Sequence, residues 1–221
     1  MLSKSISMGK YAIKNTASES KISKNMIIWA VIVILIIIGA IYYWQSQLQN
    51  PPVLGDTHAH ADFKVYLNGY AINFSQQKYN SEEGRELSSF MHLHDGDGGI
   101  MHKHIGSGTL QLFFSSLNMS LDQNCFKLDN GTTYCNNENK TLKMFVRHQN
   151  SDWQSNSDFG NYNFQDLDRI LISYGSESLD ELKKQMDSVS DRACIPSEKC
   201  PERGAPKDEN GSCSGTGPCV A

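Results

Sequence analysis

Hydrophobic residues are distributed very unevenly along this chain of 221 residues. The longest apolar run covers residues 26–44 and contains no charged residue. Nineteen residues in a helix span about 28 Å, which is close to the roughly 30 Å of a bilayer's hydrocarbon core. The run ends in Tyr42, Tyr43 and Trp44, an aromatic cluster typical of a membrane interface. The pattern therefore predicts a transmembrane helix over residues 26–44.

Beyond residue 57, apolar and polar residues alternate in short stretches, which is typical of β strands with one buried face. Asn-Gly pairs at 68–69 and 130–131 separate such stretches and predict two tight hairpin turns. A third hairpin is predicted over residues 90–104, and two further strands over 142–148 and 169–175.

Two segments have a helical pattern instead. Residues 108–118 carry apolar side chains at a spacing that predicts a short buried helix. Ser178 and Glu181 have the spacing of a capping box and predict a helix of about three turns. The predicted fold class is α+β: a small mixed or antiparallel sheet with one short packed helix, preceded by the transmembrane helix. The element order is also compatible with a β-grasp architecture, as an analogy of fold alone.

These features divide the chain into six predicted segments. They are a disordered cytoplasmic tail (1–25), the transmembrane helix (26–44), a stalk (45–56), a histidine-rich α+β ectodomain (57–175), a helix (176–192) and a cysteine-rich tail (193–221).

Charge predicts the orientation of the span. Residues 1–25 hold five lysines and one glutamate, and no Lys or Arg follows the span until Lys64. The positive-inside rule then places the N-terminus in the cytoplasm and the C-terminal domain outside the cell membrane. A cleaved signal peptide is the alternative, but the run is long for one and no small-x-small cleavage site follows Trp44. The net charge of −4 and the lack of a basic stripe argue against a nucleic-acid partner.

All six cysteines follow the span, and an even number in an exported domain favours disulfides. Cys125 and Cys135 flank a predicted hairpin and are expected to pair. The other four have the spacing C-x5-C-x12-C-x5-C, which permits two disulfides in three connectivities. A zinc or iron–sulfur site held by four thiolates is the alternative, although its spacing is longer than usual. These four are Cys194, Cys200, Cys213 and Cys219.

Histidine carries the candidate chemistry, because six of the seven histidines lie in three His-x-His pairs. Side chains at i and i+2 of a strand share a face, so the hairpin over 90–104 can place four imidazoles together if its register preserves this parity. We expect His94 and His102 to come close across the strands. Imidazole is a common ligand of zinc and copper. We therefore predict a transition-metal site, for Cu or Zn, formed by His58, His60, His92, His94, His102 and His104.

Other readings of the same residues remain open. The hairpin could be an ordinary solvated one in a structural cell-surface module. A metalloenzyme would use three His and an open metal position, with Asp62, Asp95 or Asp97 as the nearby carboxylates. Those carboxylates could instead orient the imidazoles. Thiol–disulfide exchange is a further alternative, and it would depend on Cys194 or Cys200 rather than on histidine. His148 ends a predicted strand and is expected to be a surface residue.

The combination of THAHADFKVYLNG, FMHLHDGDGGIMHKH, DLDRILISYG and ACIPSEKCPERG resembles a group of archaeal single-pass membrane proteins of uncharacterised activity. Some of them carry a disulfide-isomerase-like label. The resemblance covers residues 57–221 and implies an archaeal surface location. The label conflicts with this sequence, which has no Cys-x-x-Cys pair.

Overall fold

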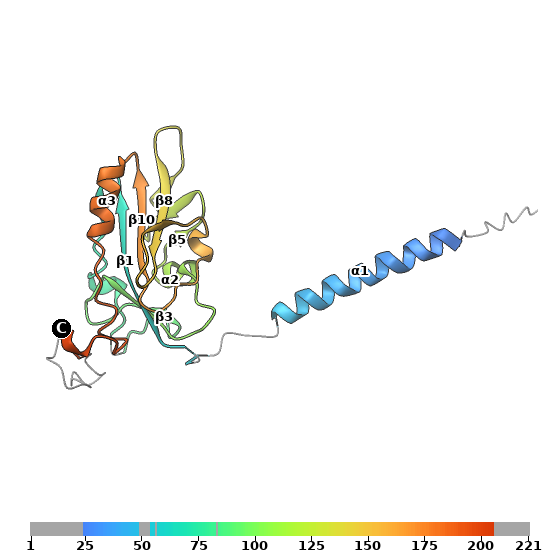
Figure 1. Cartoon of the computed structure of the whole chain (residues 1–221), viewed down its shortest axis with the longest axis horizontal. Coiled ribbons are helices and arrows are strands. Elements are labelled where there is room, and N and C mark those ends of the chain that lie inside the picture. The colour runs from blue at the N-terminus through green and yellow to red at the C-terminus, as the bar shows by residue number, and fades with distance from the viewer. Residues whose placement is uncertain (1–23, 49–53, 56, 83, 206–221) are drawn as a thin grey trace, which may run out of the picture. The chain divides into compact units, whose positions relative to one another are not determined.

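The computed structural model describes residues 24–48, 54–55, 57–82 and 84–205. The chain forms two compact units, Met1–Pro51 and Pro52–Ala221. The described part of the first unit is helix α1 (Lys24–Leu48) (Figure 1). Its large apolar side chains between Met26 and Tyr43 are exposed. Its stretch Lys24–Tyr43 is long and apolar enough to cross a membrane, a property that a signal sequence shares. The predicted apolar helix is thus confirmed, and it continues four residues beyond Trp44.

The second unit is built on a seven-stranded mixed sheet with the order β3-β4-β1-β10-β8-β9, in which β2 also pairs with β1. The central strands β1 and β10 are parallel, and the other pairs are antiparallel. The strands are β1 (Ala59–Leu67), β2 (Tyr70–Ala71), β3 (Met91–His92), β4 (Ile100–Lys103), β8 (Thr141–Arg147), β9 (Gln154–Ser155) and β10 (Arg169–Gly175).

One face of this sheet carries the hydrophobic core. Alternate residues of β1, such as Phe63 and Val65, point into it, and Phe63 packs against Phe113 of helix α2 (Leu110–Ser116). The side chain of Thr109 caps α2 by accepting the Leu112 N–H. A small antiparallel sheet, β5-β6-β7, completes this side. Its strands are β5 (Ser120–Leu121), β6 (Cys125–Lys127) and β7 (Thr133–Cys135).

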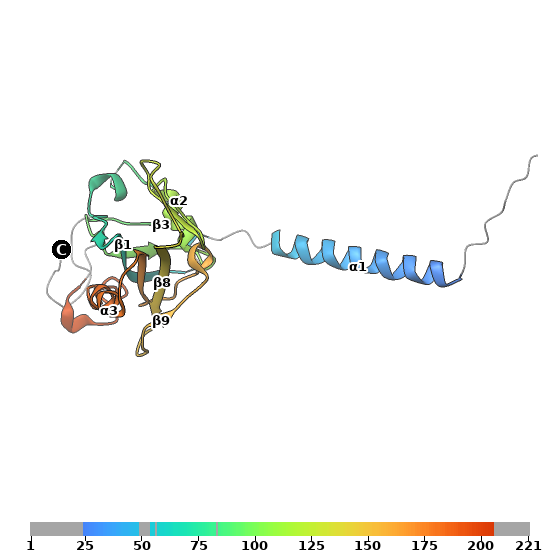
Figure 2. The same cartoon turned by 90° about the horizontal axis from the view of Figure 1, so that it is seen from above.

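The opposite face of β1 is covered by helix α3 (Leu179–Asp187) and the segment that follows it, so that α2 and α3 lie on opposite sides of the sheet (Figure 2). Lys64 Nζ donates to the Ser188 carbonyl and Tyr66 Oη bonds to Ser188 Oγ at the C-terminal end of α3. The capping box of Ser178 and Glu181 is formed as predicted.

The α+β class is therefore confirmed, with three α-helices among the described residues of the chain. Both Asn-Gly hairpins are present, and the Cys125–Cys135 disulfide closes the second. The strands β5 and β9, two residues each, were not predicted. The β-grasp analogy stays a prediction.

Only two of the four C-terminal cysteines lie among the described residues. Cys194 and Cys200 form a disulfide, so these two sulfurs do not belong to a four-thiolate metal site. The described residues do not include Cys213 and Cys219. They also leave out most of the two predicted tails and part of the predicted stalk.

Candidate metal centre

Six histidines lie on one face of three neighbouring strands. His60 of β1 is directly opposite His102 of β4, and His102 is directly opposite His92 of β3. The remaining three are each two residues from one of these along the chain, and alternation keeps them on the same face. Residues next to these histidines in the sequence, such as Ala61, Met91 and Met101, point into the hydrophobic core instead. The predicted parity of the hairpin is realised.

The six imidazoles form a closed ring, which we call the histidine ring: His94, His102, His60, His58, His104 and His92 in order of contact. Going round it, successive ring centroids are 3.8, 4.5, 4.6, 4.8, 5.1 and 5.6 Å apart. The expected approach of His94 to His102 is confirmed. The third pair, His58 and His60, lies at the start of β1, which pairs with β4, and completes the ring.

Within the ring, His58, His60 and His102 form a group that could hold a metal ion, since one nitrogen of each lies within 4.8 Å of the others. His94 Nε2 is also 3.1 Å from His102 Nδ1. Two nitrogens that each lie about 2.0–2.1 Å from one tetrahedral zinc are about 3.3 Å apart. Only small side-chain movements are therefore required for these histidines to share an ion.

Three members of the ring are oriented through Nδ1. His92 Nδ1 lies 2.8 Å from the Ser88 carbonyl oxygen, which can only accept, so this nitrogen is the donor. His94 Nδ1 lies 2.6 Å from Asp95 Oδ2, and His60 Nδ1 lies 2.7 Å from Ser197 Oγ. Metal-ligating histidines commonly use one ring nitrogen in this way and present the other to the ion. The arrangement leaves Nε2 of His92 and His60 as candidate ligand atoms.

Burial favours the neutral form of four histidines of the ring. His60 and His102 are only 2% and 6% exposed. Burial, helped by the charge that neighbouring imidazoles would carry, lowers the pKa of His60 to about 3 and that of His104 to about 4. The same causes lower the pKa of His102 well below its ordinary value, and burial lowers the pKa of His92. Neutral imidazole has the lone pair that a metal requires.

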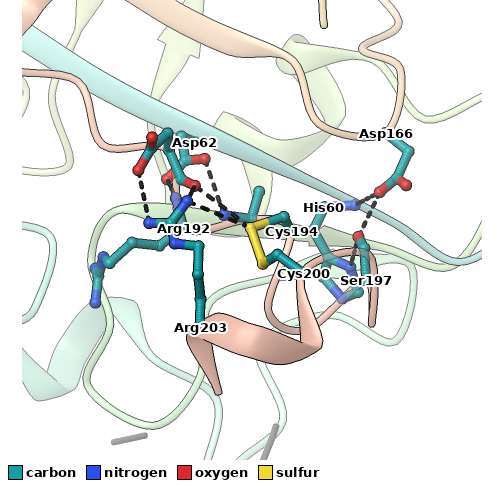
Figure 3. The surroundings of a disulfide bond; sticks show 10 residues. His60, Asp62, Asp166, Arg192, Cys194, Ser197, Cys200 and Arg203 are labelled. Atoms are coloured by element: carbon teal, nitrogen blue, oxygen red, sulfur yellow. Dashed lines mark hydrogen bonds and ion pairs between the residues drawn. A yellow bond between two sulfur atoms is a disulfide. The ribbon is translucent and has the colours of Figure 1, made fainter. Parts of the chain in front are cut away.

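A polar cluster that the sequence did not reveal supports His60. Asp166 Oδ1 accepts the His60 backbone N–H at 2.9 Å and the Ser197 hydroxyl at 2.6 Å (Figure 3). The other oxygen, Asp166 Oδ2, pairs with Lys199 Nζ at 2.7 Å. Asp166 and Ser197 are 106 and 137 residues from His60 in the sequence, and no local motif links them.

The three carboxylates singled out in the sequence have different roles. Asp95 orients His94, as one alternative expected. Asp62 is buried and accepts hydrogen bonds from Ser190 Oγ and from the backbone N–H groups of Arg192 and Ala193; burial raises the pKa of this carboxyl. Asp97 pairs with Arg192 at 2.7 Å. Asp62 and Asp97 therefore anchor the C-terminal segment.

His148 lies away from the histidine ring. Its Nδ1 is 2.7 Å from Asp168 Oδ1, and the other oxygen of that buried carboxylate accepts the Tyr162 hydroxyl at 2.6 Å. The side chain of His148 is 45% exposed. The expectation of a surface histidine at a strand end is met.

Comparisons with protein-family models, with curated proteins and with solved structures found no match.

Proposed function

We propose that this protein binds a transition metal ion, zinc or copper, through the histidine ring. The observation that carries this proposal is the closure of the ring by three strands, with three Nδ1 atoms facing oxygen atoms of other groups. A merely polar hairpin would turn its imidazoles to water, whereas His60 and His102 are buried. Zinc and copper are favoured because imidazole nitrogen suits both ions.

We further propose that the domain is held outside the cell membrane by an uncleaved α1 with its N-terminus in the cytoplasm. The two disulfides support an oxidising, extracytoplasmic location for the second unit. The lysines before the span support the orientation. The physical role would then be capture, storage or delivery of the ion at the cell surface, and an archaeal surface protein of this kind agrees with the resemblance described above.

The fold itself is proposed to be a β-grasp variant. In support, helix α2 follows two strands that pair antiparallel, β1 and β4, and the final strand β10 lies parallel to β1 at the centre of the sheet.

A metalloenzyme remains the second candidate, because one ligand of the three-histidine group, His58, is exposed. An exposed ligand leaves a side from which water or substrate can reach an ion. However, the carboxylates next to the ring are already engaged: Asp95 with His94, and Asp166 with Ser197 and Lys199. Neither is free to act as a general base, so binding without chemistry is the better-supported function.

The test is elemental analysis of the full chain purified in detergent and exposed to zinc or copper. The double variant His60→Ala/His102→Ala should lose the bound metal, and circular dichroism would show whether it still folds. Because His58 is exposed, His58→Ala should weaken binding without disturbing the core. His148→Ala is the matched control and should retain the metal. Unchanged metal content in both ring variants would reject the proposal.

A further inference from the structure

The disulfide between Cys194 and Cys200 closes a short loop that contacts His60 of the histidine ring (Figure 3). We call residues 194–200 the latch loop. Two of its side chains reach the support of His60: Ser197 bonds to His60 Nδ1 and to Asp166, and Lys199 pairs with Asp166. The orientation of one buried imidazole therefore depends on a loop that a disulfide closes.

From this arrangement we propose that the Cys194–Cys200 disulfide is a redox latch, whose reduction by a dithiol weakens metal binding at the histidine ring. This inference rests on the proposed metal-binding function and adds a regulator to it.

Besides the disulfide, turn hydrogen bonds and the two contacts with Asp166 hold the shape of the latch loop. No helix or strand crosses residues 194–200, and its backbone bonds are those of consecutive turns, such as Lys199 N–H to the Cys194 carbonyl at 2.8 Å. Glu198 has a φ of 55°, a left-handed conformation that is unfavourable for a non-glycine residue. Opening the disulfide frees the loop to relax this conformation and to withdraw Ser197 from His60.

The surroundings of the two sulfur atoms favour exchange with a thiolate at Cys194. Cys194 is half-buried, whereas Cys200 is only 7% exposed. Arg203 Nη1 lies 3.5 Å from Cys194 Sγ. Its positive charge attracts the incoming thiolate and stabilises Cys194 as the thiolate that is released in the second step. The same guanidinium pairs with Asp191 at 2.8 Å, which offsets part of its charge.

The reaction is an ordinary two-step exchange. One thiolate of the dithiol attacks Cys194 Sγ, a mixed disulfide forms, and Cys200 leaves as a thiolate that takes up a proton. The second thiolate of the dithiol then attacks the first sulfur of the dithiol, which is bonded to Cys194 in the mixed disulfide. This step releases Cys194 as a thiolate beside Arg203. Two electrons pass to the protein, and the dithiol becomes a cyclic disulfide. Of the two protons that the dithiol loses, one is taken up by Cys200 and the other goes to solvent, because Cys194 stays a thiolate.

The second disulfide provides a matched control. Cys125 and Cys135 join β6 to β7 in the small sheet, and none of the interactions described for the histidine ring involves them. Loss of that bond should destabilise its hairpin without changing the support of His60.

The experiment measures zinc affinity of the full chain in detergent by competition with a chromophoric chelator. In Cys194→Ser/Cys200→Ser, where no new thiol can bind the ion, the dissociation constant should rise about 10- to 100-fold, as for loss of a group that orients a ligand. Ser197→Ala should reproduce part of this rise with the disulfide intact, and Ser197→Thr, which keeps a hydroxyl, should bind more tightly than Ser197→Ala. Cys125→Ser/Cys135→Ser should bind zinc as the unchanged chain does. Arg203→Gln, with all cysteines kept, should slow reduction of the Cys194–Cys200 bond by dithiothreitol relative to the unchanged chain.

The outcomes separate the two proposals. If the oxidised, unchanged chain binds no zinc, the proposed function and the latch both fail. If it binds zinc, but Cys194→Ser/Cys200→Ser binds equally well or more tightly, the latch alone is overturned. An equal loss in both double cysteine variants would also overturn the latch, because the effect would then follow general destabilisation.

Discussion

Acid should destabilise the metal-free domain through His60. In the folded domain, burial lowers the pKa of this imidazole from 6.5 to about 3. Between these two values the unfolded chain binds a proton at His60 and the folded domain does not. Acidification in that range therefore favours unfolding, and the stabilisation from a neutral His60 is complete only above the unfolded pKa of 6.5.

The size of the effect follows from the shift. Each pH unit below 6.5 costs about 1.4 kcal/mol per proton bound only by the unfolded state, so His60 alone should cost about 2 kcal/mol at about pH 5. No discount for solvent is required, because His60 is 2% exposed. His104, with a pKa of about 4, acts in the same direction, but its partial exposure makes its contribution smaller.

Urea denaturation of residues 52–221, freed of metal by a chelator and followed by circular dichroism from about pH 7.5 to about pH 5, measures this dependence. In His60→Gln the fall in the free energy of unfolding should be smaller by about 2 kcal/mol. His148→Gln, a change outside the histidine ring, should keep the full fall. A free energy of unfolding that is constant over this range, or an equally steep fall in His60→Gln, would refute the reasoning.

Three further predictions concern the scaffold. Replacing Cys125 and Cys135 by serine should lower the free energy of unfolding by about 2–3 kcal/mol, because the hairpin loses its cross-link; urea denaturation measures this, and no loss would mean that hydrogen bonds alone hold the hairpin. Phe113→Ala should lower the free energy of unfolding by about 3–5 kcal/mol in the same measurement, because this side chain of α2 is fully buried against the sheet. A loss below about 1 kcal/mol would contradict that packing. Ser178→Ala removes the cap of α3 and should cost about 1 kcal/mol, with Ser176→Ala as the uncapped control that should cost less.

Much of the fold could be predicted from local patterns. Asn68 and Gly69 both have positive φ angles, as the tight turn between β1 and β2 requires. An Asn-Gly pair in the sequence predicts such a turn. The spacing of Ser178 and Glu181 likewise predicts the start of α3 from neighbouring residues alone. The parallel pairing of β1 with β10 could not be predicted, because about a hundred residues separate the strands and no local signal records their register.

In the candidate site, too, local features could be predicted from the sequence and long-range contacts could not. Alternation within strands placed the members of each His-x-His pair on one face, because side-chain direction repeats every two residues. The contacts of His60 with Asp166 and Ser197 depend on long-range packing of the C-terminal segment against β1, and ordinary Asp and Ser residues do not announce such contacts. The predicted carboxylates Asp62 and Asp97 lie near the histidines in sequence, yet they hold that segment in place instead.

X-ray absorption spectroscopy of the zinc- or copper-loaded full chain tests the central claim most directly. We predict a first shell of nitrogen at about 2.0 Å with the outer-shell scattering of at least three imidazoles, and its loss in His60→Ala/His102→Ala. A shell dominated by sulfur at about 2.3 Å, or by oxygen without imidazole scattering, would contradict the account.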